Sequence, residues 1–81
     1  MLNLTVNTRE DKEAVLREAL AFFGEHGVGL QAHETSAGLT FSSHLGFVQL
    51  SFSSDAAGVA VVDIATREFE EQVRTFAHQI Q

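Results

Sequence analysis

The chain has 81 residues, with 11 acidic and 5 basic side chains and a formal net charge of −6 when histidine is neutral. This length allows one domain, and a hydrophobic fraction of 44% is typical of a globular protein rather than a disordered one. The sequence has no cysteine, which excludes a disulfide scaffold, a thiol nucleophile and a cysteine-ligated zinc or iron–sulfur site.

The basic residues are too few and too scattered to form a nucleic-acid-binding surface. Affinity for a phosphate backbone comes largely from Lys and Arg side chains that displace condensed counterions. The five available here are interleaved with glutamates on two helix-like stretches: Arg9, Lys12, Arg17, Arg67 and Arg74. We therefore expect no nucleic-acid partner. An acidic surface instead favours solubility and basic protein partners or cations.

Residues 35–54 carry no charged side chain, which is also typical of a membrane-spanning segment. They nevertheless include six serines, two threonines, Gln49 and His44, whose polar groups would lack partners in lipid. The N-terminal residues lack the basic start and apolar run of a secretory signal. We expect no membrane partner and, by default, a bacterial cytoplasmic protein.

The first predicted strand covers residues 2–6, where apolar and polar side chains alternate. Thr8 is the predicted N-cap of the helix that follows, because Asp11 three residues later completes a capping box. This helix is predicted to stop at Gly24 or Gly27. Its apolar stripe has spacings of three and four and consists of Val15, Leu16, Ala19, Leu20 and Phe23.

Four further strands are predicted at residues 30–36, 39–43, 47–53 and 59–65. Ala37 and Gly38 are expected to form the turn between the first two, and residues 55–58 a hairpin loop with Gly58 in the left-handed region. Thr66 is the predicted cap of a final helix. The apolar residues of that helix step by four, three and four: Phe69, Val73, Phe76 and Ile80.

The predicted element order, β-α-β-β-β-β-α, indicates a single α+β domain over residues 1–81. The simplest antiparallel solution is a five-stranded sheet of order 1-5-4-3-2 with both helices packed on one face. This arrangement resembles one repeat of the TATA-binding-protein fold, and also the helix-grip proteins. The resemblance is one of topology and involves no residue motif, so it implies no function.

The sheet face predicted to lie away from the helices is the most informative feature. Strict alternation places on it Asn3, Thr5, Phe47, Gln49, Ser51, Val59 and Val61. We expect Phe47, Val59 and Val61 to form one apolar patch ringed by hydroxyls and amides, with Asn3, Thr5 and Gln49 among the ring. Such patches mark interfaces more often than chance. The alternative is an ordinary wet surface that is somewhat apolar.

The histidines and carboxylates are not predicted to come together in a metal-binding or catalytic site. A two-residue turn at 37–38 would make His33 and His44 diagonal neighbours, about 7–8 Å apart at the backbone. No third metal ligand is predicted beside them, and a zinc site needs at least three protein ligands. We therefore favour two exposed histidines over a metal site. Glu34 is predicted either to face the helices, where burial would raise its pKa, or to reach water from the strand end. We predict no catalytic residue and no cofactor.

The sequence supports three hypotheses for function. A catalytic function is less favoured than these three, because no general acid, general base and charge-stabilising group converge. We favour a noncatalytic interaction module, a homodimer or a protein-binding subunit, that uses the uncovered sheet face or a sheet edge, since so short a chain has a marginal core. The second is a small-ligand binder with a pocket between helices and sheet. The third is an acidic inhibitor or immunity-type protein that masks a basic partner with Glu10, Asp11, Glu13, Glu68, Glu70 and Glu71.

Overall fold

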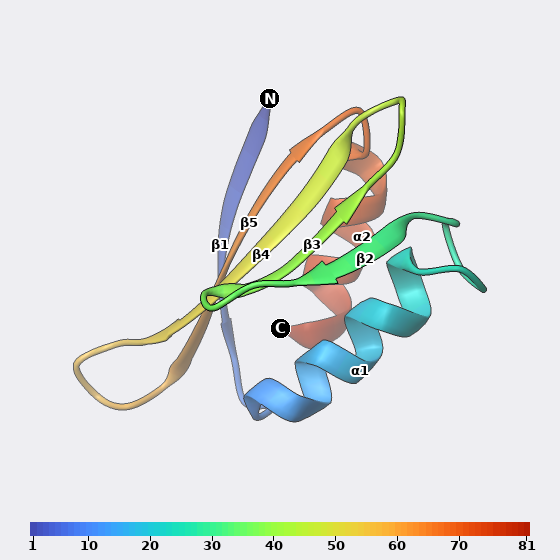
Figure 1. Ribbon diagram of the computed structural model, residues 1–81. Helices are drawn as coiled ribbons and strands as arrows, with labels where there is room; N and C mark the ends of the chain where they lie inside the picture. The colour runs from blue at the N-terminus through green and yellow to red at the C-terminus, as the bar shows by residue number, and fades with distance from the viewer.

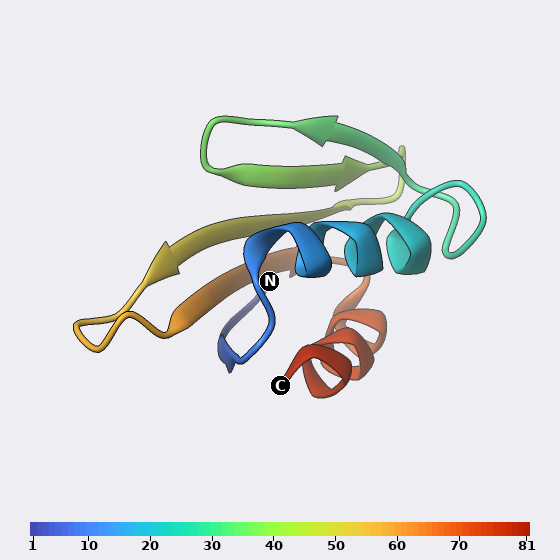
Figure 2. The ribbon, with the colours of Figure 1, turned by 90° about the horizontal axis from the view of Figure 1, so that it is seen from below.

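A computed structural model describes residues 1–81. Its elements, in chain order, are β1 (Leu2–Thr8), α1 (Lys12–Phe23), β2 (Gln31–Glu34), β3 (Gly38–Ser42), β4 (Phe47–Ser54), β5 (Ala60–Arg67) and α2 (Glu70–Ile80). The strands form one antiparallel sheet of order β1-β5-β4-β3-β2, and both helices lie on the same side of it (Figures 1 and 2). The predicted α+β class, element order and strand order are confirmed.

The core lies between the helices and the inner face of the sheet, which is the face turned toward them. Alternation along each strand sorts the side chains: Val48 and Leu50 of β4 are buried while Gln49 between them is exposed. Val62 and Ile64 repeat this pattern in β5. The helices cover this face with one residue per turn, namely Val15, Ala19 and Phe23 from α1 and Val73, Phe76 and Ile80 from α2.

Phe23 is the centre of an aromatic cluster that joins both helices to the sheet. Its ring centroid lies 5.1 Å from that of Phe76 on α2 and 5.4 Å from that of Phe41 on β3. All three rings are buried. The predicted stripe of the final helix is therefore confirmed, whereas the stripe predicted for α1 is too wide, because Leu20 is 43% exposed.

The predicted cap of α1 is wrong. Asp11 is the N-cap, and its carboxylate accepts a hydrogen bond from the backbone N–H of Ala14 at 2.8 Å. Thr8 instead ends β1, where its hydroxyl donates to the carbonyl oxygen of Ile80 and accepts from the N–H of Glu10. This hydroxyl therefore ties the end of β1 to the end of α2.

The predicted cap of α2 is wrong for a similar reason. Thr66 is buried within β5, and its hydroxyl donates to the carbonyl oxygen of Phe47 on β4 at 2.6 Å. The helix begins four residues later at Glu70, after Phe69 and without a side-chain cap. In both cases the strand runs two residues beyond its predicted end, because the threonine hydroxyl finds a partner in the neighbouring structure.

The turn between β2 and β3 lies one residue earlier than predicted. Thr35 and Gly38 exchange backbone hydrogen bonds of 2.9 and 3.3 Å, so the two central residues are 36 and 37. Gly38 is a strand residue, and a Cβ there would collide with the carbonyl oxygen of Leu50. This single-residue shift of the turn moves the register between the two strands by two residues, and His33 lies opposite Thr40.

Candidate functional site

The outer sheet face, which points away from the helices, carries no single apolar patch. Phe47 lies opposite Arg67, whose guanidinium carbon is 5.9 Å from the centroid of the Phe47 ring. Val61 lies opposite Ser53, six residues farther along β4 and so about 20 Å from Phe47 at the usual rise per residue. Val59 precedes β5 and lies in the exposed hairpin loop. The predicted patch is wrong, because residues that share a face need not be neighbours along the strands.

The other three predicted interface residues do come together. They line a hollow of about 340 Å³ on the outer face, formed by Asn3, Thr5, Gln49, Ser51, Asp63 and Ala65 with the backbone around them. Ala65 lies between Asn3 and Gln49 in the register, and its small side chain leaves the space. The Thr5 hydroxyl donates to the Asp63 carboxylate at 2.7 Å. This hollow presents amides, hydroxyls and one already partnered carboxylate, which suit hydrogen bonding rather than catalysis.

The two histidines proposed as metal ligands are separated. His33 pairs with Thr40 in the middle of β3, whereas His44 lies beyond the end of β3, in the loop before β4. Their predicted neighbourhood depended on the misplaced turn and is wrong. No group of three His, Cys, Asp or Glu side chains suited to holding a metal ion occurs in the fold.

Glu34 takes the second of its two predicted positions. It lies opposite Leu39 near the end of short β2, and its side chain is exposed. A strand end leaves room for a long side chain to reach water even where alternation turns its Cβ toward the helices.

Glu10 and Glu18 form a carboxyl pair that the sequence pattern does not reveal. One Glu18 oxygen accepts a hydrogen bond from the Gln79 amide at 3.3 Å, and its other oxygen is buried and has no hydrogen-bond partner while both carboxyl groups are ionised. A side-chain hydrogen bond with Glu18 raises the pKa of Glu10, and lost hydration and the charges of Glu18 and Asp11 act in the same direction. Helical periodicity does not reveal the contacts among Glu10, Glu18 and Gln79, because Glu10 lies in the loop before α1 and Gln79 lies on α2.

The free edge of β1 is the longest unpaired stretch of backbone in the sheet. β1 has seven residues, LNLTVNT, with no charged residue, proline or glycine. The opposite edge, β2, has four residues that include His33 and Glu34, and all but Ala32 are exposed. Natural edge strands are usually blunted by shortness, charge or proline. β2 is short and carries a charged residue, whereas β1 has none of these features.

A groove of about 250 Å³ runs along this open edge, between β1 and α2. Leu4 and Val6 line it from the strand and Ala77 from the helix, while Arg74 and His78 supply the polar side. Leu4 is only half-buried although it belongs to the inner face. The hydrophobic core therefore remains partly open at β1.

No family model matches the chain, and neither a curated protein nor a solved structure shows significant similarity to it. Neither helix combines the length and hydrophobicity that crossing a bilayer requires.

Proposed function

We propose that this chain is a noncatalytic interaction module that self-associates through the open edge of β1. The observation that carries this proposal is the contrast between the two sheet edges, because only β1 is long and free of charge, proline and glycine. In an antiparallel ladder alternate residues direct their N–H and C=O groups to one neighbour. The remaining residues of β1 therefore direct theirs outward, where an added strand pairs with them.

Burial at the edge supports the same interface. Leu2 and Leu4 pack against the core but are only half-buried, and the groove beside them is open. A second strand along β1 removes this apolar surface from water, at about 25 cal/mol per Å². A domain of this length has little core to spare, so association of this kind adds stability where the fold lacks it.

A second copy of the chain fits this edge through the charges of α2. Glu70 and Arg74 are four residues apart, as are Arg74 and His78, so the three share one flank of the helix. Arg74 and His78 line the groove beside β1. A two-fold axis that pairs β1 with its own copy runs the two α2 helices antiparallel. The acidic first turn of one helix then lies toward the basic later turns of the other.

The masking hypothesis has less support. Its acidic residues form two groups, one at the start of α1 and one at the start of α2, and Figure 1 places these helix starts at opposite ends of the domain. Asp11 is already used as a helix cap. We retain the likeness to one TATA-binding-protein repeat as a proposal about topology, and it adds no function.

The proposal is tested by placing the same charge at the edge and at the centre of the outer face. Thr5→Lys adds an ammonium group at an exposed position of β1, opposite Asp63. Gln49→Lys is the matched control, because it adds the same group to an exposed position of interior β4. We expect the unmodified chain and Gln49→Lys to show a dimeric mass that falls on dilution, and Thr5→Lys to remain a monomer, by sedimentation equilibrium. Loss of the dimer in Gln49→Lys alone would assign the interface to the sheet face, and a monomeric unmodified chain at all concentrations would refute self-association.

A further inference from the structure

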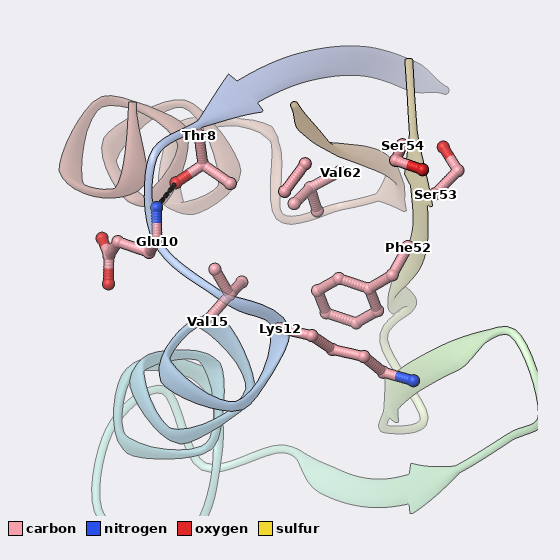
Figure 3. A pocket seen from close by; sticks show the side chains of 9 residues that line it. Thr8, Glu10, Lys12, Val15, Phe52, Ser53, Ser54 and Val62 are labelled. Atoms are coloured by element: carbon pink, nitrogen blue, oxygen red, sulfur yellow. Dashed lines mark hydrogen bonds between the residues drawn. The ribbon is translucent and has the colours of Figure 1, made fainter. Parts of the chain in front are cut away.

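A hollow opens beside the first turn of α1 because the sheet ends there in small side chains. Thr8, Ala60 and Ser54 form the last row of the inner face, with Ala60 opposite both of the others. The first helical residue is Lys12, so no large apolar side chain of α1 reaches back over this row. The result is a cavity of about 250 Å³ between the start of α1 and the ends of β4 and β5 (Figure 3).

The inner wall of this cavity is apolar. Val15 enters from α1, while Phe52 and Val62 lie opposite each other on β4 and β5. Figure 3 shows the three side chains converging on the space beneath Thr8. Val15 and Val62 are buried, but Phe52 is only half-buried, so one side of its ring remains available. An apolar group seated here would remove the exposed part of this wall from water.

The charged groups at the rim favour an anion. The Lys12 ammonium lies 5.7 Å from the centroid of the Phe52 ring, and Glu10 also lines the cavity. Arg9 and Asp11 line an adjoining hollow that shares Thr8, Glu10, Lys12 and Ala60 with the cavity. The acids nearby already have partners. Asp11 caps α1, and the carboxyl group of Glu10, which interacts with that of Glu18, points away from Phe52 in Figure 3. Lys12 is thus the cation that lines the cavity, and the Glu10 carboxyl group on the same rim is turned away from the apolar inner wall.

We infer that this cavity binds a small organic acid, with the carboxylate at Lys12 and a short apolar tail against Val15, Phe52 and Val62. The volume lies below the usual range for ligand pockets, about 300–1,000 Å³, so a short chain or a single ring fits and a long acyl chain does not. The site is separate from the β1 edge, and the inference does not depend on self-association.

The test is a titration of the ¹⁵N-labelled chain, followed through its backbone amide resonances, with three probes that share one tail. Hexanoate carries the carboxylate, hexanol has no charge and hexylamine has the opposite charge. We expect hexanoate to give saturable shifts at Lys12, Ala60 and Val62, and the other two probes to bind more weakly. Equal binding of hexylamine would overturn the assignment of the charge, and shifts centred elsewhere would overturn the site.

Substitutions separate the tail from the head group. Ala60→Phe fills the cavity from the sheet, and Ser54→Leu fills it from an exposed position that the fold tolerates. Both should abolish the hexanoate shifts in chains whose spectra remain folded. Lys12→Gln should weaken binding about two- to fivefold, the range expected for one exposed ion pair, whereas Arg17→Gln on the exposed side of α1 should have no effect. Unchanged binding in both filled variants would refute the inference.

Discussion

At the scale of single residues, a few side chains connect parts of the fold that are distant in sequence. Thr8 joins the end of β1 to the end of α2 through its hydroxyl, and Thr66 joins β5 to β4. Phe23 and Phe76 join the two helices, with ring centroids 5.1 Å apart. Each of these contacts crosses between elements, so a substitution at any of these positions removes a contact between two elements.

Phe76→Ala should lower the free energy of unfolding by about 3–5 kcal/mol, the cost of emptying a large buried aromatic site. Phe76 is fully buried and packs against two other rings. Leu20→Ala, at a position of α1 that is 43% exposed, is the control and should cost less than about 1 kcal/mol. Chemical denaturation measures both. Equal losses would show that α2 does not pack through this stripe.

The pKa of Glu10 predicts how stability depends on pH. Its hydrogen bond to Glu18 raises the pKa of Glu10 above the ordinary value of 4.5. At a pH between the unfolded and folded pKa values, the folded chain therefore retains a proton on Glu10 that the unfolded chain has released. The resulting stabilisation is fully present below pH 4.5 and is lost as the pH rises through the folded-state pKa. Glu10→Gln keeps a hydrogen-bond donor at every pH. It should raise the denaturation midpoint at neutral pH and leave it unchanged in acid, whereas Glu34→Gln at an exposed strand end should show no such difference.

At the scale of elements, the periodicity of apolar residues predicts the helices and strands, whereas local capping and turn residues do not predict where these elements end. The stripe of α2 and the alternation in β4 and β5 depend on burial of a whole face, which many residues specify together. A cap or a turn depends on one residue, and tertiary partners compete for it. Thr8 fits a capping box, but the carbonyl oxygen of Ile80 takes its hydroxyl. Gly38 fits a turn, but the close approach of Leu50 requires it in a strand.

The start of α1 tests this interpretation. Asp11→Ala should lower the free energy of unfolding by about 0.5–2 kcal/mol, because it removes the carboxylate that caps the helix. Glu13→Ala, an acidic residue in the same first turn with no capping bond, should cost only a few tenths of a kcal/mol. Denaturant midpoints compare the two variants. A smaller loss in Asp11→Ala than in Glu13→Ala would show that the helix begins elsewhere.

The sequence predicts some neighbours within the candidate sites and not others, because individual contacts depend on tertiary structure. Asn3, Thr5 and Gln49 were assigned to one outer-face neighbourhood, and they do share a hollow. Phe47 and Val61 were assigned to one patch, but their positions along β4 and β5 keep them apart. Glu10, Glu18 and Gln79 meet only because the loop before α1, α1 itself and α2 converge. Alternation defines the face of a side chain, whereas its neighbours depend on register and helix placement.

At the scale of the whole molecule, the charge distribution predicts that the protein does not bind nucleic acid. β5 extends to Arg67, which places one cation on the outer face, but it lies over Phe47, and Asp63 lies on the same face. Without further cations there is little counterion release to drive binding, and the net charge of −6 adds repulsion. Fluorescence anisotropy with A/T-rich and mixed-sequence duplexes should show no binding at physiological or low salt. Binding that weakens steeply with added salt would contradict the charge argument.

The central claim is that β1 is the edge through which two copies pair, and amide hydrogen exchange at different protein concentrations tests it most directly. The two edges of the sheet serve as site and control within one chain, because β1 and β2 are both unpaired on one side. We predict that the β1 amides directed away from β5 exchange rapidly in dilute solution and become protected as the concentration rises, while the outward amides of β2 remain unprotected. Exchange at β1 that is independent of concentration, or protection that appears at β2 instead, would contradict the claim.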